Sequence, residues 1–127
     1  MMQPSPAVAP AGKAPPRSRI LIVDDDPVVS GMLGVTLGAA GYAIVEVNSG
    51  EEALSLLARS NAGSLPDLVF LDIEMGEGLD GFEVCRRLKA NPALRHIPVI
   101  FLTARSEMAF ETMGFTVGAV DYITKPI

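Results

Sequence analysis

Acidic side chains stand where two apolar runs of the sequence stop, and they suggest metal-dependent chemistry. One run ends in Asp24, Asp25 and Asp26, and a later run ends in Asp72. Asp26 is interpreted as the N-cap of the helix that follows. Carboxylates that converge repel one another, which raises their pKa values unless a cation joins them. Oxygen ligands without His or Cys suit a hard ion, so the sequence predicts a site for Mg²⁺, with Mn²⁺ as a substitute.

A hydroxyl group and an ammonium group close two further apolar runs. Thr103 and Ala104 follow one run, and Lys125 follows another. Transfer of a phosphoryl group requires charge stabilisation on its equatorial oxygens, which Mg²⁺, Lys125 and Thr103 would provide. Asp72 would then be the nucleophile that forms an aspartyl phosphate.

A parallel sheet is needed to bring these positions together. Short apolar runs that end in turn residues are typical of buried parallel strands, whose carboxyl ends face the ligand crevice in a doubly wound sheet. The sequence predicts strands near residues 19–24, 42–47, 67–72, 97–103 and 120–124, and helices near 27–40, 50–60, 80–90 and 106–117. Right-handed crossovers then give an α/β fold with a five-stranded parallel sheet and helices on both faces.

The first predicted helix carries three glycines in one row, at Gly31, Gly34 and Gly38. Each glycine costs about 1 kcal/mol relative to alanine in a helix interior. The row is interpreted either as a smooth stripe that another helix could approach closely or as tolerated positions on an exposed face.

Composition limits the class of protein. A chain of 127 residues forms one domain, and a net charge of −5 without a basic stripe argues against direct binding to nucleic acid. The single cysteine, Cys85, excludes an internal disulfide and fits a reducing compartment, so we expect a cytoplasmic location and a buried thiol. Residues 1–17 hold five of the ten prolines and are predicted to be a disordered tail before a domain at 18–127. No apolar run is long enough to cross a membrane.

Residues 18–127 resemble the receiver domain of two-component response regulators. The matching segments are Ile20–Pro27, Phe70–Ile73, Asp80–Phe82, Leu102–Ala104 and Gly118–Pro126. The resemblance implies a flavodoxin-like strand order of 2-1-3-4-5. It also implies that the domain is a phosphorylated switch that catalyses only its own phosphorylation and dephosphorylation, rather than an enzyme with an external substrate.

Roles for individual residues also follow from the resemblance. Asp72 would accept a phosphoryl group from the phosphohistidine of a sensor histidine kinase or phosphotransfer protein. Mg²⁺ would bind Asp24, Asp25, the side chain of Asp72 and the backbone carbonyl of Glu74. Thr103, Ala104 and Lys125 would bind the phosphoryl oxygens, and Thr103 and Tyr122 would form the switch.

The chain departs from the family pattern at three places. The loop Met75–Gly81 lacks the usual proline and is one residue longer, so we expect it to be more mobile. The fourth helix carries Met108, Phe110 and Met113 where related receivers usually have charged residues, and this face is predicted to bind an output domain, a partner protein or a second copy of the chain. The chain also stops at Ile127, where a final helix would begin.

The missing final helix leads to an expectation about the sheet. Apolar residues of Ile20–Val23 and Leu68–Leu71, together with the glycine stripe, would lack a cover. We therefore expect the chain to be a fragment of a longer regulator, or a second chain to cover the gap. A natural short receiver whose first helix shifts over the sheet is the alternative.

Two other functions are considered. In a Mg²⁺-dependent phosphatase of the haloacid-dehalogenase type, Asp24–Val28 would be the first motif, with Thr103 and Lys125 as the second and third. That assignment leaves Asp72 without a role and lacks a downstream acidic motif. A nucleotide-binding module would need a glycine-rich phosphate loop after the first strand, which the sequence does not have.

Overall fold

The computed structural model describes residues 17–104, 113 and 115–125. Its elements are β1 (Arg19–Val23), α1 (Pro27–Ala39), β2 (Ala43–Val47), α2 (Gly50–Arg59), β3 (Leu68–Asp72), α3 (Gly81–Ala90), β4 (Val99–Thr103) and β5 (Asp121–Thr124). All five strands are parallel, in the order β2-β1-β3-β4-β5. The predicted fold class and strand order are therefore confirmed.

The strands and the first three helices lie close to their predicted positions. The largest difference is at β4, which begins at Val99 rather than at residue 97. Ile97 instead donates its N–H to the carbonyl of Leu94, 3.0 Å away, so it belongs to a turn. The predicted helix 106–117 and the predicted tail 1–17 fall largely outside the described residues.

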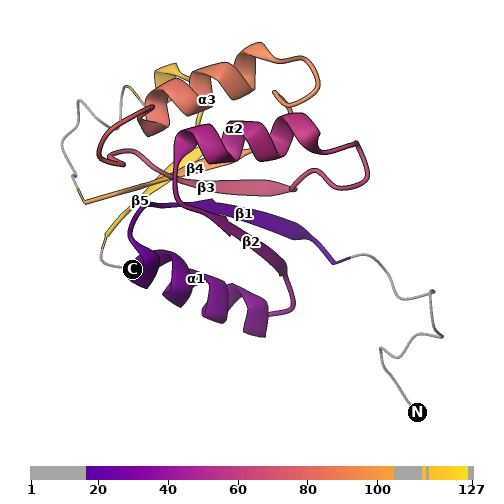
Figure 1. Ribbon diagram of the computed structural model, residues 1–127, viewed down its shortest axis with the longest axis vertical. Coiled ribbons are helices and arrows are strands. Elements are labelled where there is room, and N and C mark those ends of the chain that lie inside the picture. Colours follow the sequence, from indigo (N-terminus) through magenta and orange to yellow (C-terminus); the bar gives the residue numbers. More distant parts are fainter. Residues whose placement is uncertain (1–16, 105–112, 114, 126–127) are drawn as a thin grey trace.

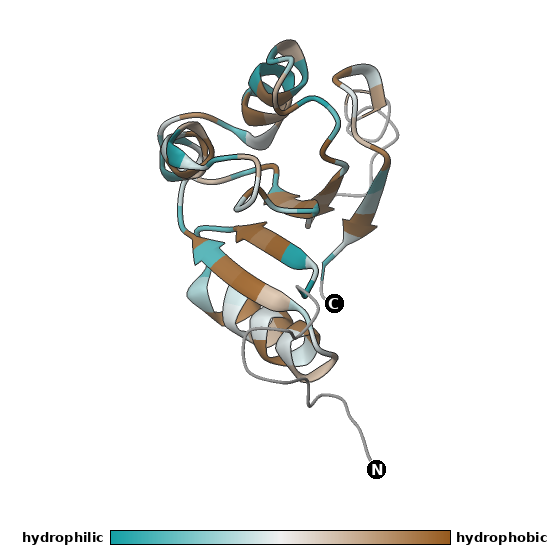
Figure 2. Ribbon diagram, turned by 90° about the vertical axis from the view of Figure 1, so that its right-hand side faces the viewer, coloured by the Kyte–Doolittle hydropathy of each residue, from teal (hydrophilic) through white to brown (hydrophobic). Residues whose placement is uncertain are grey.

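The sheet lies between two helical layers, with α2 and α3 on one face and α1 on the other (Figure 1). Side chains along a strand alternate between these faces. Leu21 and Val23 join the large core under α2 and α3, whereas Ile20 and Ile22 form a smaller cluster with Leu33 of α1. In Figure 2 the central strands are mainly hydrophobic, as expected for strands buried on both faces.

Local signals set the helix boundaries. Asp26 is the N-cap of α1 and its Oδ1 accepts from the N–H of Val28 at 3.0 Å, which confirms its predicted role. Ser49 caps α2 by accepting from the N–H of Glu52, also at 3.0 Å. Gly41 follows the end of α1 with a φ of 103°, a conformation that glycine adopts without steric cost.

The glycine stripe on α1 does not form one surface for a second helix. A Cβ at Gly34 would collide with the carboxylate of Glu46 on β2, and one at Gly38 would reach Ile44. Gly31 alone faces open space. Gly34 therefore lies against the edge strand of the sheet, and the stripe interpretation is wrong for it, whereas Gly38 is exposed and makes only an ordinary contact there.

The expectation of an uncovered sheet is also wrong for several side chains. No helix follows β5 within the described part of the chain, yet Ile20, Ile22 and Phe70 are buried. They are buried because they pack in one cluster with Leu33 of α1. The exposed apolar side chains include Val28, Met32 and Val35 on α1 itself, and Val120 and Ile123 at β5.

Among the residues that the structure describes, no helix has the length and apolar character needed to span a membrane.

Candidate functional site

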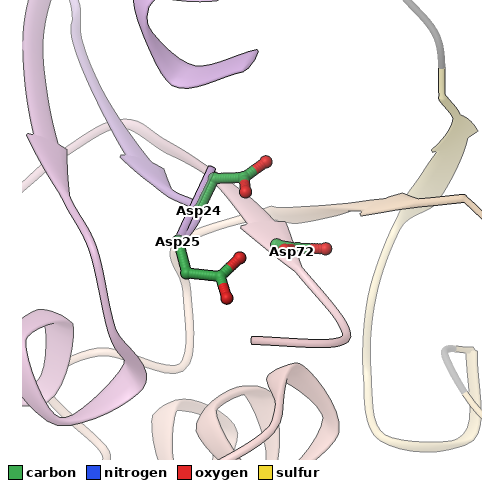
Figure 3. A group of neighbouring side chains, drawn as sticks. All are labelled: Asp24, Asp25 and Asp72. Carbon is green, nitrogen blue, oxygen red and sulfur yellow. The ribbon is translucent and has the colours of Figure 1, made fainter. Parts of the chain in front are cut away.

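Three carboxylates converge at the carboxyl ends of β1 and β3. One oxygen from each of Asp24, Asp25 and Asp72 lies within 4.8 Å of the others, and the three side chains extend into the same region (Figure 3). Asp24 and Asp72 are buried, while Asp25 is exposed. The strand pairing explains the convergence, because Val23 is in register with Leu71 and each strand runs directly into its acidic residue.

Lys125 lies against the two buried carboxylates. Its Nζ is 2.9 Å from Asp24 Oδ2 and 3.5 Å from Asp72 Oδ1. The contact with Asp24 Oδ2 is an ion pair without the alignment of a hydrogen bond, since that buried oxygen has no hydrogen-bond partner in the described part of the chain. The backbone N–H of Lys125 donates to the carbonyl of Thr103 at 2.6 Å, which fixes the lysine beside the end of β4.

The local charges shift the ionisation of this group. Burial and the neighbouring charge of Asp24 raise the pKa of Asp72 to about 7, against the opposing effect of Lys125. Burial disfavours the ammonium of Lys125, but the carboxylates of Asp24 and Asp72 outweigh it and raise the pKa of this lysine. Near neutral pH, Asp72 is therefore close to its titration midpoint and a second cation would favour its ionised form.

The other predicted site residues on β4 and β5 lie near this group. Thr103 is buried at the last position of β4, and Ala104 follows it with an exposed side chain. Tyr122 lies in β5 opposite Phe101 and packs against the core under α2 and α3. Thr103 thus lies at the carboxyl end of the sheet with the carboxylates. Tyr122 is in register with Phe101, two residues before Thr103, and so lies further from that end.

The loop after β3 passes beside the carboxylates. Glu74 is exposed, Met75 is buried, and a Cβ on Gly76 would lie 3.6 Å from Asp25 Oδ2. The loop is held at Leu79, whose N–H donates to Glu51 Oε2 of α2 at 3.0 Å. Sequence reasoning missed Glu51, because 28 residues separate it from Leu79 and no local motif links them.

The predicted partner face is only partly within the described residues. Met108 and Phe110 lie outside them. Met113 is 46% exposed and Phe115 is 47% exposed, which agrees with an accessible apolar surface in this segment.

The donor chemistry of the site fits a hard divalent cation. It offers three carboxylate oxygens, and neither imidazole nor thiolate is among the ligand atoms. Asp24 and Asp72 are buried with one ammonium between them, so the local charge is negative when both are ionised.

Comparisons with known proteins identify relatives of the chain. The family described as response regulator receiver domain matches residues 20–127. Response regulator PleD of Caulobacter vibrioides is 42% identical over 110 residues, which are 87% of this chain and 23% of that protein. A probable cyclic di-GMP phosphodiesterase of Vibrio cholerae is 46% identical over 108 residues, 85% of this chain and again 23% of the relative. The chain thus spans less than a quarter of each of these two relatives.

A solved structure agrees with these matches. The N-terminal domain of a response regulator receiver protein from Methanoculleus marisnigri is 41% identical, with a TM-score of 0.74 and coverage of 85% of this chain and 84% of that one. None of these matches supports the haloacid-dehalogenase alternative. The chain belongs to the receiver domain family of two-component response regulators.

Proposed function

We propose that Asp72 is the phosphoacceptor of this receiver domain. The observation that carries the proposal is the position of its buried carboxylate, within 4.8 Å of two other carboxylates and 3.5 Å from the Lys125 ammonium. A carboxylate oxygen of Asp72 attacks the phosphorus of a phosphohistidine. The P–N bond breaks and its electron pair returns to the imidazole, which leaves an aspartyl phosphate.

Mg²⁺ would be held by Asp24, Asp25, Asp72 and the backbone carbonyl of Glu74, and Mn²⁺ could replace it. The ion would neutralise charge on the phosphoryl oxygens when it is bound. Lys125 would also contact these oxygens, and Thr103 and Ala104 would donate to them. The raised pKa of Asp72 supports the need for a cation, because the nucleophile must be ionised to react.

The domain would therefore act as a switch that promotes only its own phosphorylation and dephosphorylation. Its phosphoryl donor would be a sensor histidine kinase or a phosphotransfer protein. Phosphorylation would bias Thr103 and Tyr122 between two arrangements and so alter the surface that carries Met108, Phe110 and Met113. This surface would bind an output domain, a partner protein or a second copy of the chain.

Phosphorylation can be tested with acetyl phosphate and Mg²⁺. The wild-type chain should gain one acid-labile phosphoryl group, detected by intact-mass spectrometry, and Asp72→Asn should gain none. Labelling of Asp72→Asn to the wild-type level would show that the acceptor is another residue. Repeated release of phosphate from a small ester without any kinase would favour a phosphatase instead.

The partner surface can be tested separately. Charged substitutions at Phe110 and Met113 should impair assembly or output while leaving phosphorylation of Asp72 unchanged. Loss of both properties together would point to misfolding rather than to a partner surface.

A further inference from the structure

The loop between β3 and α3 is attached to the first turn of α2 by one side chain. The Glu51 carboxylate accepts a hydrogen bond from the N–H of Leu79, with 3.0 Å between Oε2 and N. Glu51 is the second residue of α2, directly after Gly50. The contact therefore joins the first turn of α2 to the loop between β3 and α3, and the two bonded residues are 28 positions apart in the sequence.

The backbone of the loop is adapted to this contact. Gly78 has a φ of 94°, and a Cβ there would lie 2.7 Å from Glu51 Oε2. A side chain at this position would strain the backbone and displace the carboxylate. The glycine thus allows the carboxylate to lie directly against the loop.

The other end of the same loop lies at the carboxylate cluster. Gly76 has a φ of 69°, and a Cβ there would be 3.6 Å from Asp25 Oδ2. Met75 is buried and fixes the loop to the core. Only Glu77 and Gly78 separate Gly76 from Leu79, so the contact with Glu51 restricts the loop three residues from the backbone beside Asp25.

The carboxylate of Glu51 is held in its ionised form, in which it accepts hydrogen bonds. The backbone N–H of Glu51 itself and the N–H of Leu79 lower the pKa of Glu51, so the carboxylate stays ionised at neutral pH. An ionised acceptor makes a stronger hydrogen bond than a neutral one. The loop has no proline to restrict it, and this bond supplies a restriction from outside the loop.

We infer that Glu51 is a positioning residue for the phosphorylation site: by holding Leu79, it sets the path of the loop past Asp25 and thereby the position of the Glu74 carbonyl. This inference rests on the proposed function of the site. Glu51 touches none of the reacting groups and acts only through the loop.

The first measurement needs no metal. Amide hydrogen exchange in the metal-free protein should show the Leu79 N–H exchanging roughly tenfold faster in Glu51→Ala than in the wild type. Glu51→Gln should restore most of the protection, since its amide oxygen can accept the same hydrogen bond.

The second measurement is the Mg²⁺ dissociation constant, determined by titration calorimetry. Loss of a residue that orients a ligand typically weakens metal binding, and we expect Glu51→Ala to bind Mg²⁺ about tenfold more weakly. Glu77→Ala is the matched control. Glu77 is an exposed carboxylate in the same loop, without a hydrogen bond or ion pair among the described residues. Its removal also deletes one negative charge and should leave the affinity nearly unchanged.

The outcomes separate this inference from the proposed function. A wild-type chain that binds no Mg²⁺ would contradict the proposed function, whatever the Leu79 exchange shows. Wild-type binding with equal affinities for Glu51→Ala and the wild type would overturn the positioning role. Equal weakening in Glu51→Ala and Glu77→Ala would overturn it as well, because charge alone would then account for the loss. If Glu51→Ala fails to fold, Glu51→Gln decides. Affinity that follows the exchange of the Leu79 N–H, with both unchanged or both impaired, supports the inference. Fast exchange with wild-type affinity, or protected exchange with weak binding, overturns it.

Discussion

The interiors of the strands and their carboxyl ends have opposite effects on the folded protein. Leu71 and Phe101 are fully buried and lie in the core under α2 and α3. One residue after Leu71 the chain buries the carboxylate of Asp72, and directly after Val23 it buries Asp24. Of the four polar or charged residues that are buried in the described part of the chain, only Ser30 lies away from these strand ends.

Within a single strand, the interior therefore contributes to stability, whereas the carboxyl end contributes to the site. Removal of apolar surface from water stabilises the fold, whereas burial of a carboxylate opposes it unless a partner compensates. Lys125 supplies one positive charge to two buried carboxylates, and the pKa of Asp72 remains raised. The strand ends therefore remain incompletely compensated without a second cation.

The largest effect should come from the strand interior. Leu71→Ala removes a fully buried side chain from the core, and we expect a loss of about 2–5 kcal/mol in the free energy of unfolding, measured with urea. Val45→Ala on the edge strand is the control, because Val45 is 47% exposed and should cost about 0.5 kcal/mol or less. Equal losses at the two positions would contradict the assignment of the core.

A substitution where the two regions meet should have the next largest effect. A Cβ at Gly81, the first residue of α3, would collide with the backbone carbonyl of Asp72. Gly81→Ala should cost about 1–3 kcal/mol and also weaken Mg²⁺ binding, since the end of β3 must move. Gly31→Ala in α1 meets no neighbour within 4 Å and should instead stabilise the fold by about 0.5–1 kcal/mol. Similar effects of the two substitutions would show that helix propensity, rather than the contact with Asp72, determines the result.

Loss of the buried carboxylate should stabilise the metal-free protein in a pH-dependent way. The pKa of Asp72 is raised from 3.8 to about 7, so folding favours its protonated form. The stability that protonated Asp72 contributes to the fold is complete below its unfolded pKa of 3.8, and it is lost as the pH rises through the folded pKa of about 7. Asp72→Asn should therefore raise the melting temperature at pH 8 by about 4 °C or more relative to wild type, and by much less at pH 5.

Mg²⁺ provides the control for this prediction. Saturating Mg²⁺ should raise the melting temperature of the wild type at pH 8 more than that of Asp72→Asn. A stabilisation by Asp72→Asn that is the same at pH 5 and pH 8 would contradict the raised pKa as its cause.

The smallest change in stability is expected at Asp25. This carboxylate is exposed, so Asp25→Ala should alter the free energy of unfolding by no more than about 0.5 kcal/mol. Its Mg²⁺ affinity should nevertheless fall by at least about tenfold, because a proposed ligand is lost. An unchanged affinity would mean that the metal binds elsewhere.

Features governed by local rules could be predicted from the sequence. The N-cap at Asp26 depends on a few neighbouring residues, and it is present as predicted. The positions of Asp24 and Asp72 also follow, because parallel strands bring their carboxyl ends to one edge of the sheet.

Features that depend on tertiary packing could not be predicted. The burial of Ile22 and Phe70 depends on the placement of α1, and the Glu51–Leu79 contact depends on the distance between two segments far apart in sequence. Gly34 looked like part of an open stripe, yet it lies against Glu46 of the neighbouring strand. In each case the partner is remote in the chain, and single-sequence periodicity contains no information about it.

The buried thiol of Cys85 makes this protein suited to chemical probing. Burial raises the pKa of Cys85 to about 11, and its Sγ lies 3.5 Å from the carbonyl of Val117, to which the thiol donates. The native protein should therefore react very slowly with a maleimide at neutral pH. A single cysteine introduced on the surface could then carry a fluorophore selectively. Slow residual alkylation of Cys85 itself would report how often α3 separates from the segment before β5.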